Sequence, residues 1–203
     1  MTLSLTLILI LITAAMTLYA WQNPTVLSRW MFNAYQIARR NEYWRFITSG
    51  FVHADWGHLI FNMISLYFFG QLMEQVMGSA YYLTLYLVGI IVSEIPSYLR
   101  HRNNPNYNSL GASGGVAAVV FAGIVFFPLN PIYIFFIPIG IPGFLFGLLY
   151  MLYSYYEARR GGSYVNHSAH LWGALFGVAF AVLLFPGALP NFFDQILSYR
   201  PFR

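Results

Sequence analysis

The chain has 203 residues, of which 59% are hydrophobic, 20% are aromatic and only 8% are charged. Charged residues make up about 25% of an ordinary soluble protein, so this composition excludes a dispersed soluble fold, and the high hydrophobicity excludes a disordered chain. The net charge of +4 is not gathered in a basic patch with interleaved aromatic residues, which argues against nucleic-acid binding.

Six long apolar runs predict transmembrane helices. A helix needs about 20 residues to cross ~30 Å of hydrocarbon, and these runs are continuous, unlike the alternating strands of a barrel. We therefore predict an all-α membrane protein, a six-helix bundle that forms one domain over residues 1–203. The predicted spans are residues 2–20, 56–76, 80–99, 113–127, 132–156 and 168–186, and a tail, 187–203, follows.

The connections between the predicted spans differ in length and composition. The connection 21–55 is the longest, and its tryptophans and tyrosines suit an element that lies in the membrane interface. Within it, we expect Trp44 and Arg45 to be structural anchors. In the fifth span, a group of prolines and glycines predicts a kink, which is either a static bend or a point where the helix moves to admit a substrate helix; the group is Pro138, Gly140, Pro142 and Gly143.

The fourth span is too short to cross the bilayer alone. At 1.5 Å per residue it is roughly 22 Å long, so we expect the preceding loop to dip into the membrane to meet it. Irregular backbone at that depth is tolerated where it is buried in protein or lines a water-filled cavity. This geometry predicts that Ser113, at the helix start, lies within the membrane region beside water.

Polar residues gather at one end of three spans. His58 and Asn62 share one face of the second span, the segment 111–115 opens the fourth span around Ser113, and His170 lies near the start of the sixth. In an alternating bundle these three ends face the same side of the membrane. Polar groups in membrane spans are costly, so we interpret each as a functional candidate.

Small residues predict that the fourth and sixth spans pack closely. They recur every four positions, a pattern that lets helix backbones meet in lipid. This packing would bring Ser113 level with His170, and a serine with a neighbouring imidazole is the minimal activated nucleophile. Asn62, His58 and the Ser113 amide could then stabilise an oxyanion. The small residues are Gly114, Ala118 and Ala122 in one span and Ala169, Gly173, Gly177 and Ala181 in the other.

Other interpretations of these residues stay open. A metal or haem site could be built from His53, His58, His167 and His170, although it would leave Ser113 and Asn62 without a role. A non-catalytic protein that binds membrane clients is a third class. Taken singly, His53 is favoured as an interfacial residue over one at the mouth of the site, His101 and His167 as loop residues, and Glu74 and Glu94 as local tethers.

Several sparse motifs together resemble the rhomboid family of intramembrane serine proteases. They are Trp44-Arg45, the HLIFN segment with His58 and Asn62, GASG at 111–114 and AHLWG at 169–173, and the resemblance covers about residues 44–185.

The resemblance implies a six-helix bundle with Ser113 as the nucleophile and His170 as the general base. It implies His58, Asn62 and the Ser113 amide as the oxyanion site, supported by Gly111 and Ala112, and transmembrane proteins in the lipid bilayer as substrates. No cofactor and no metal are expected. The family often has an aromatic residue where this chain has Ala117. We therefore expect either that another ring, Tyr155 or Trp172, stacks on the histidine, or that the imidazole is held less firmly.

Two signals disagree about orientation. Eight of the arginines lie in connections on the side of the polar motifs, which by the positive-inside rule predicts that this side faces the cytoplasm. The family resemblance implies a site that faces outward, in a multi-pass protein of the inner membrane of a bacterium, and we follow the resemblance. The eight arginines are Arg29, Arg39, Arg40, Arg45, Arg100, Arg102, Arg159 and Arg160.

Overall fold

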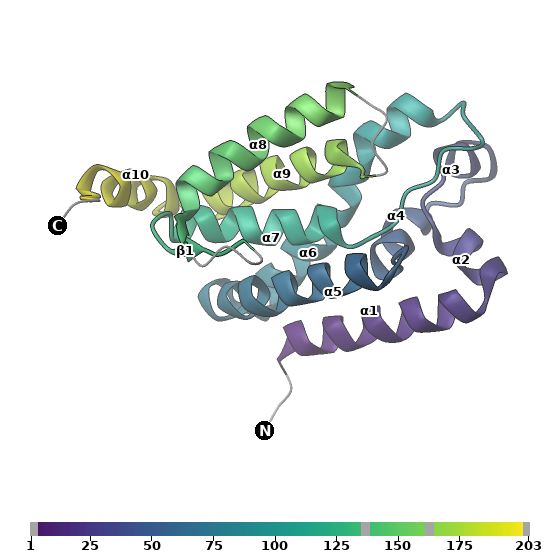
Figure 1. The fold of residues 1–203 in the computed structure, drawn as a ribbon, viewed down its shortest axis with the longest axis horizontal. Coiled ribbons are helices and arrows are strands. Elements are labelled where there is room, and N and C mark those ends of the chain that lie inside the picture. Colours follow the sequence, from purple (N-terminus) through teal and green to yellow (C-terminus); the bar gives the residue numbers. More distant parts are fainter. Residues whose placement is uncertain (1–3, 135–138, 161–164, 201–203) are drawn as a thin grey trace.

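The computed structural model describes residues 4–134, 139–160 and 165–200 (Figure 1). This part of the chain is mostly helical, and one short antiparallel pair joins β1 (Pro131–Ile132) to β2 (Ile141–Pro142). The helices are α1 (Leu5–Gln22), α2 (Pro24–Trp30), α3 (Ala34–Arg40), α4 (Arg45–Thr48), the 3-10 turn η1 (Ser49–Phe51), α5 (Trp56–Ser65), the π-helical turn η2 (Leu66–Gly70), α6 (Gln71–His101), α7 (Ser113–Phe126), α8 (Gly143–Arg160), α9 (His167–Leu184) and α10 (Ala188–Ser198).

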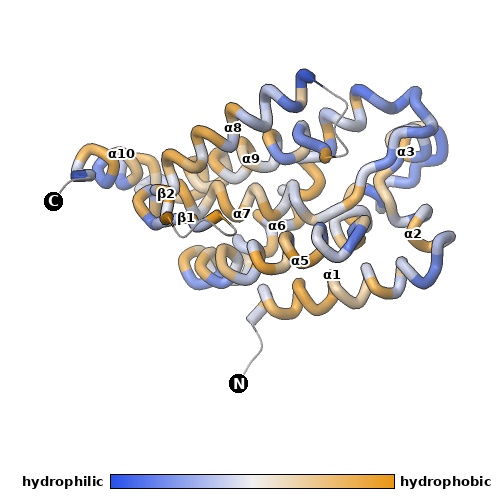
Figure 2. Tube along the Cα trace, viewed as in Figure 1, coloured by the Kyte–Doolittle hydropathy of each residue, from blue (hydrophilic) through white to orange (hydrophobic). Residues whose placement is uncertain are grey.

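Several helices are apolar enough for a membrane. Within the described residues, the stretches Leu5–Gln22, Trp56–His101 and His167–Leu184 have the length and hydropathy of spans, and α7 is a shorter apolar helix. Tyr82 lies against Gly70, although a straight helix would place these two residues about 18 Å apart. The second stretch therefore folds back between them, at Gly78, where φ is +78°. Figure 2 shows apolar residues along these helices and hydrophilic residues gathered around α3 and the α6–α7 connection. These features are those of an integral membrane protein.

The fifth predicted span begins later than expected. Instead of a helix from residue 132, β1 and β2 come first and α8 starts only at Gly143. Pro142 lies in β2; proline has no amide donor and disfavours helical geometry in the residue before it. The expected kink inside a helix is therefore wrong for Gly140 and Pro142, which precede α8, and for Gly143, which is its first residue, and Pro138 lies outside the described residues.

The tail after the last predicted span forms a helix. In α10, the Gln195 side-chain amide donates to the Phe126 carbonyl at 3.2 Å, one of the carbonyls that the end of α7 leaves without an intrahelical partner. The tail therefore covers one end of α7.

Helix α7 lies in the middle of the bundle, and every residue from 114 to 125 is buried. Its backbone touches α9 directly: the space where a side chain would begin at Gly173 is filled by the backbone of Gly114, and the space at Gly177 by the backbone of Ala118. Successive contacts advance by one turn on both helices, so α7 and α9 run in the same direction. Only glycine permits so close an approach.

The first connection forms α2, α3 and α4 at one end of the bundle (Figure 1). Arg45 holds them together: it is buried, pairs with Glu42 at 2.6 Å and donates to the backbone carbonyls of Ser28 and Met31 at 2.9 and 2.7 Å. These carbonyls end α2, where backbone acceptors lack helical partners. Arg45 is therefore a structural anchor.

Candidate active site

Ser113 is the first residue of α7, and the backbone before it has a conformation that favours glycine. Gly111 has φ of +120°, and its amide donates to the Ser49 carbonyl at 2.9 Å. The His58 ring occupies the place that a side chain at Gly111 would need. A left-handed backbone pressed against an imidazole leaves room for no other residue at this position.

A chain of hydrogen bonds through His53 holds Ala112, the residue between Gly111 and Ser113. The Ala112 amide donates to Nε2 of His53 at 3.2 Å, so the proton of this imidazole lies on Nδ1. Nδ1 is 3.2 Å from Oγ1 of Thr17, which in turn donates to the Phe51 carbonyl at 3.2 Å. The His53 carbonyl accepts from the Trp21 indole at 2.7 Å. Helix α1 thus holds the segment before Ser113 through one imidazole.

His53 is not the interfacial residue that was expected. It is fully buried, and burial, reinforced by the nearby His58 ring and opposed by Asp55, lowers the pKa of His53 to about 3. The imidazole is therefore neutral at ordinary pH, as its two hydrogen bonds require. Both ring nitrogens are engaged within the protein, so His53 cannot serve in the alternative metal site.

His58 and Asn62 lie on one face of α5, as their spacing predicts. Asp55 caps this helix by accepting from the His58 amide at 2.8 Å, and the His58 ring meets the His53 ring edge-on with 4.9 Å between centroids. Asn62 is buried, and its side-chain amide donates to the His58 carbonyl at 2.9 Å. The His58 ring faces Gly111, whereas one amide hydrogen of Asn62 is already used within the helix.

His170 is covered by an aromatic ring, although not by either expected one. Tyr150 of α8 stacks on it at 6.2 Å between centroids, with 23° between the planes. Tyr155 and Trp172 are 47% and 45% exposed and do not take this place. Tyr150 also contacts Phe121 of α7, at 5.5 Å.

One feature of the sequence points to Tyr150. It shares a face of α8 with Phe146, one turn earlier, and the two rings stack at 5.7 Å between centroids. His167, expected in a loop, is the first residue of α9 and meets His170 edge-on at 5.9 Å.

A buried carboxylate joins the segments that precede Ser113 and His170. Glu94 of α6 accepts from the Ser109 hydroxyl at 2.8 Å and from the Asn166 amide at 3.3 Å. Ser109 lies four residues before Ser113, and Asn166 lies four residues before His170 and caps α9 by accepting from the Ala169 amide. Glu94 is thus a tether, as expected, but it joins two segments, the one before α7 and the one before α9. The sequence pattern does not reveal this pair of contacts.

Ser113 and His170 lie near the starts of two parallel helices whose backbones touch. Among the described residues, no hydrogen bond joins the Ser113 hydroxyl to the His170 ring. Hydrogen bonds of catalytic pairs are often long or absent without substrate. The arrangement places a hydroxyl, two imidazoles and a free helix-start amide in one region, which is a set of groups suited to acyl transfer.

Comparison with known proteins matches residues 40–187 to the rhomboid domain. The chain belongs to the rhomboid family. This match covers most of the chain and includes the segments that carry Ser113 and His170, so the resemblance seen in the motifs is confirmed. Members of this family include serine proteases.

Individual rhomboid relatives share about a third of their aligned residues with this chain. Rhomboid-like protein 12, mitochondrial, of Arabidopsis thaliana is 34% identical over an aligned length of 144 residues, and the alignment covers 63% of this chain and 42% of that protein. The putative rhomboid protease YdcA of Bacillus subtilis strain 168 is 33% identical over 95 residues, 46% of this chain and 47% of that protein. The human presenilin-associated rhomboid-like protein, mitochondrial, is 29% identical over an aligned length of 138 residues, and the alignment covers 65% of this chain and 35% of that protein. The matched parts are about half or less of the length of these relatives.

Proposed function

We propose that this rhomboid is an intramembrane serine endopeptidase that cuts transmembrane helices of other membrane proteins with a Ser113–His170 dyad. The observation that carries the proposal is the backbone contact between α7 and α9, because it brings together the two helices whose first turns contain the hydroxyl and the imidazole. One relative, the putative rhomboid protease YdcA, is named for this chemistry.

The proposed reaction is acyl transfer followed by hydrolysis. His170 takes the proton of Ser113 as Oγ attacks the substrate carbonyl, and it then gives this proton to the leaving amine as the C–N bond breaks. Water then attacks the acyl group as His170 takes its proton, and His170 returns this proton to Oγ of Ser113 as the ester bond breaks, which restores the hydroxyl. Substrate binding must first draw the two side chains into hydrogen-bond contact.

The oxyanion of this reaction needs donors that are free. The Ser113 amide is at the start of α7, where amides have no intrahelical partner, and we assign it this role together with His58 and the second amide hydrogen of Asn62. The Ala112 amide is already bound to His53. Ala112 and Gly111 therefore support the site by shaping the backbone instead of donating to the oxyanion.

The proposed setting is a single rhomboid membrane domain in the inner membrane of a bacterium, with the site facing outward. A phosphatase reporter that is active only outside the cytoplasm, fused after residue 203, tests the orientation. Because the family topology places the end of the sixth span inside, the reporter should be silent. An active reporter would reverse the orientation and leave the dyad unaffected.

The dyad is tested with purified protein and a single-pass substrate whose helix carries weakening residues. Ser113→Ala and His170→Ala should each abolish cleavage, and a fluorophosphonate should label the unsubstituted chain but not Ser113→Ala. Ser198→Ala and His101→Ala are matched controls that change the same groups elsewhere and should cleave normally. Cleavage by either dyad variant would exclude the mechanism.

Asn62→Ala tests the oxyanion assignment separately. Removing one donor typically lowers the rate about 10²–10³-fold, so residual cleavage should remain while fluorophosphonate labelling becomes slower. An unchanged rate would remove Asn62 from the site.

A further inference from the structure

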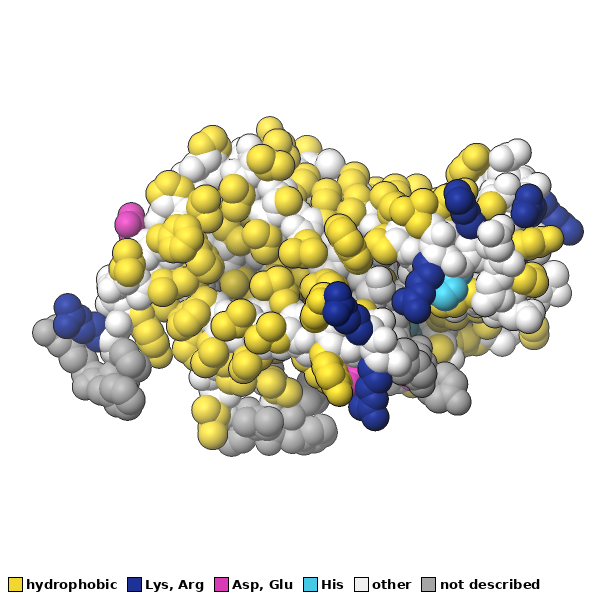
Figure 3. All heavy atoms as spheres, turned by 90° about the horizontal axis from the view of Figure 1, so that it is seen from above, with side chains coloured by type: hydrophobic (Ala, Val, Ile, Leu, Met, Phe, Trp, Pro, Cys, Tyr) yellow, Lys and Arg dark blue, Asp and Glu magenta, His cyan; other side chains and the backbone are white. Residues whose placement is uncertain are grey.

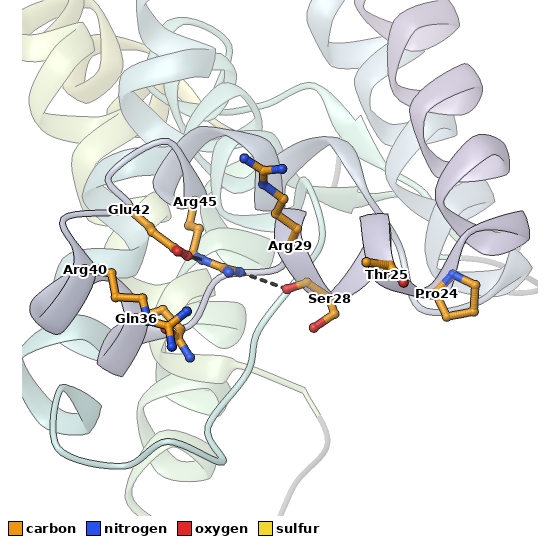
Figure 4. Close-up of a pocket in the computed structure, with 8 residues that line it drawn as sticks. All are labelled: Pro24, Thr25, Ser28, Arg29, Gln36, Arg40, Glu42 and Arg45. Atoms are coloured by element: carbon orange, nitrogen blue, oxygen red, sulfur yellow. Dashed lines mark hydrogen bonds and ion pairs between the residues drawn. The ribbon is translucent and has the colours of Figure 1, made fainter.

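A hollow of about 650 Å³ opens between α2 and α3 (Figure 4), and neither Ser113 nor His170 lines it. One wall is the α2 face from Pro24 to Arg29, and the other is formed by Gln36 and Arg40 of α3. Glu42 and Arg45 complete the lining. The hollow therefore lies within the first connection of the chain, which the sequence predicts to be interfacial.

The charges that line this hollow do not balance. Glu42 is the acidic residue of the lining, and it is already paired with Arg45 at 2.6 Å. Arg29 and Arg40 are exposed, and within the described part of the chain neither forms an ion pair. Two guanidinium groups therefore border the hollow without an acidic partner among the described residues, one from each of its two walls. Guanidinium groups bind anions that carry several oxygens.

The wall also contains an unused hydrogen-bond acceptor. The Gln36 side-chain oxygen is buried and has no partner among the described residues. A buried amide oxygen without a donor is costly, so a bound group that carries a hydroxyl beside its negative charge would satisfy it. Arg40 and Gln36 lie close together in Figure 4, which places the cation and the acceptor on the same wall.

The surroundings place this hollow at the level of lipid headgroups. It lies at the hydrophilic end of the bundle (Figures 1 and 2), and the exposed rings of Tyr19, Tyr43 and Trp44 occur in the same part of the chain. Aromatic residues gather where membrane meets water. Figure 3 shows an apolar surface over much of the molecule, with most of the basic side chains in the right half of the view and a further one at the opposite end.

We propose that the hollow between α2 and α3 binds the phosphate of an anionic glycerophospholipid, with Arg29 and Arg40 on the phosphate and Gln36 accepting from a headgroup hydroxyl. Basic pockets at the ends of membrane helices recognise such headgroups. A glycerol headgroup provides both the negative phosphate and the hydroxyl donor. This proposal is independent of the proteolytic activity.

Native mass spectrometry of the full chain in detergent tests the proposal. Phosphatidylglycerol should remain bound at lipid concentrations about tenfold below those needed for phosphatidylcholine with the same acyl chains. Inorganic phosphate and glycerol 3-phosphate compete in separate arms. If either small anion displaces phosphatidylglycerol at equal concentration, the site recognises a free phosphate and the lipid assignment is overturned.

Paired variants separate this site from general attraction of anions. Arg29→Gln/Arg40→Gln should weaken phosphatidylglycerol binding at least about tenfold, while the control Arg100→Gln/Arg102→Gln removes the same charge from exposed positions outside the hollow and should leave binding within twofold. Equal loss in both would overturn the proposal. Gln36→Leu should reduce the preference for phosphatidylglycerol over phosphatidic acid, and an unchanged preference would exclude the Gln36 contact.

Discussion

Helices α7 and α8 both pack beside α9, but they do so in opposite ways. Against α7, the glycines of α9 lie on backbone atoms, and α7 is buried from Gly114 to Val125. Against α8, α9 is met by side chains such as Tyr150, and only Gly143, Gly147 and Ser154 of α8 are buried. The α7–α9 contact has no space for an added group unless the two helices move apart, because backbone meets backbone. The α8–α9 contact can adjust by rotation of side chains. The proposed nucleophile and base therefore lie on the two helices that are packed most rigidly, α7 and α9, and α8 covers His170 through Tyr150.

The largest expected effect comes from adding one methyl group to the α7–α9 contact. A Cβ at residue 177 would meet the Ala118 backbone, with Cα at 2.8 Å and the carbonyl nearer still, and backbone cannot move aside. Gly177→Ala should lower stability by roughly 3 kcal/mol, measured by thermal unfolding in detergent.

Gly147→Ala in α8 is the matched control for this change. There the added methyl would meet side-chain carbons of Ile124 and Phe121 at 3.3 and 3.4 Å, so stability should change by only about 0.5 kcal/mol. Equal losses in the two variants would contradict the difference between the two helix contacts.

The next effect concerns the carboxylate that holds the starts of α7 and α9 in register. Glu94→Leu removes the acceptor of Ser109 and Asn166, and a misplacement near 1 Å at a reacting pair costs about 10² in rate. We expect a loss of that order in kcat. Glu94→Gln keeps one acceptor oxygen and should recover part of the rate. A Glu74→Gln control changes a carboxylate of α6 that accepts from the Leu5 and Thr6 amides at the start of α1, and it should leave kcat unchanged. If Gln recovers nothing while both variants remain folded, Glu94 does not position the pair.

His53 allows its two hydrogen bonds to be separated. Glutamine can still accept from the Ala112 amide, whereas asparagine reaches only the Thr17 side. His53→Gln should therefore retain several times more cleavage activity than His53→Asn. The reverse order would show that the link to α1 matters more than the Ala112 contact.

The same residue predicts a pH effect with a definite sign. Because the pKa of His53 is lowered from 6.5 to about 3, the folded chain binds fewer protons than the unfolded chain at this site. The stabilisation is complete above about pH 6.5 and is lost as the pH falls toward 3. Between pH 7.5 and 4.5 the unfolding temperature should drop more for the unsubstituted chain than for His53→Gln. Equal drops would show that His53 does not titrate in this way.

The smallest expected effect concerns the cover. Tyr150→Leu removes the ring that stacks on His170, an interaction of about 0.5–1.5 kcal/mol, and should reduce cleavage up to about tenfold. Trp172→Leu and Tyr155→Leu change the exposed rings and should have no effect. If either control lost more cleavage activity than Tyr150→Leu, the ring changed in that control, and not Tyr150, would be the one that stacks on His170.

The periodicity of small residues predicts that the fourth and sixth spans pack closely, and polar residues at the starts of three spans predict where a site would be. Patterns of this kind are visible because each depends on spacing within one helix. Hydropathy predicts the start of the fifth span too early, because apolar residues continue through β1 and β2 and hydropathy does not distinguish an apolar strand from a helix. His53 was misjudged because its partners, Thr17 and Ala112, lie far away in the chain.

The amino-acid sequence by itself determined the membrane class, the rhomboid family and the residues proposed for catalysis, because composition and short motifs are local properties. Only the tertiary structure decided that Tyr150 covers His170, that Glu94 links the segments before Ser113 and His170, and that Arg29 and Arg40 border one hollow. These relations join side chains that are far apart in the sequence, and they depend on how the helices are rotated and offset against one another, which no spacing within a single helix records.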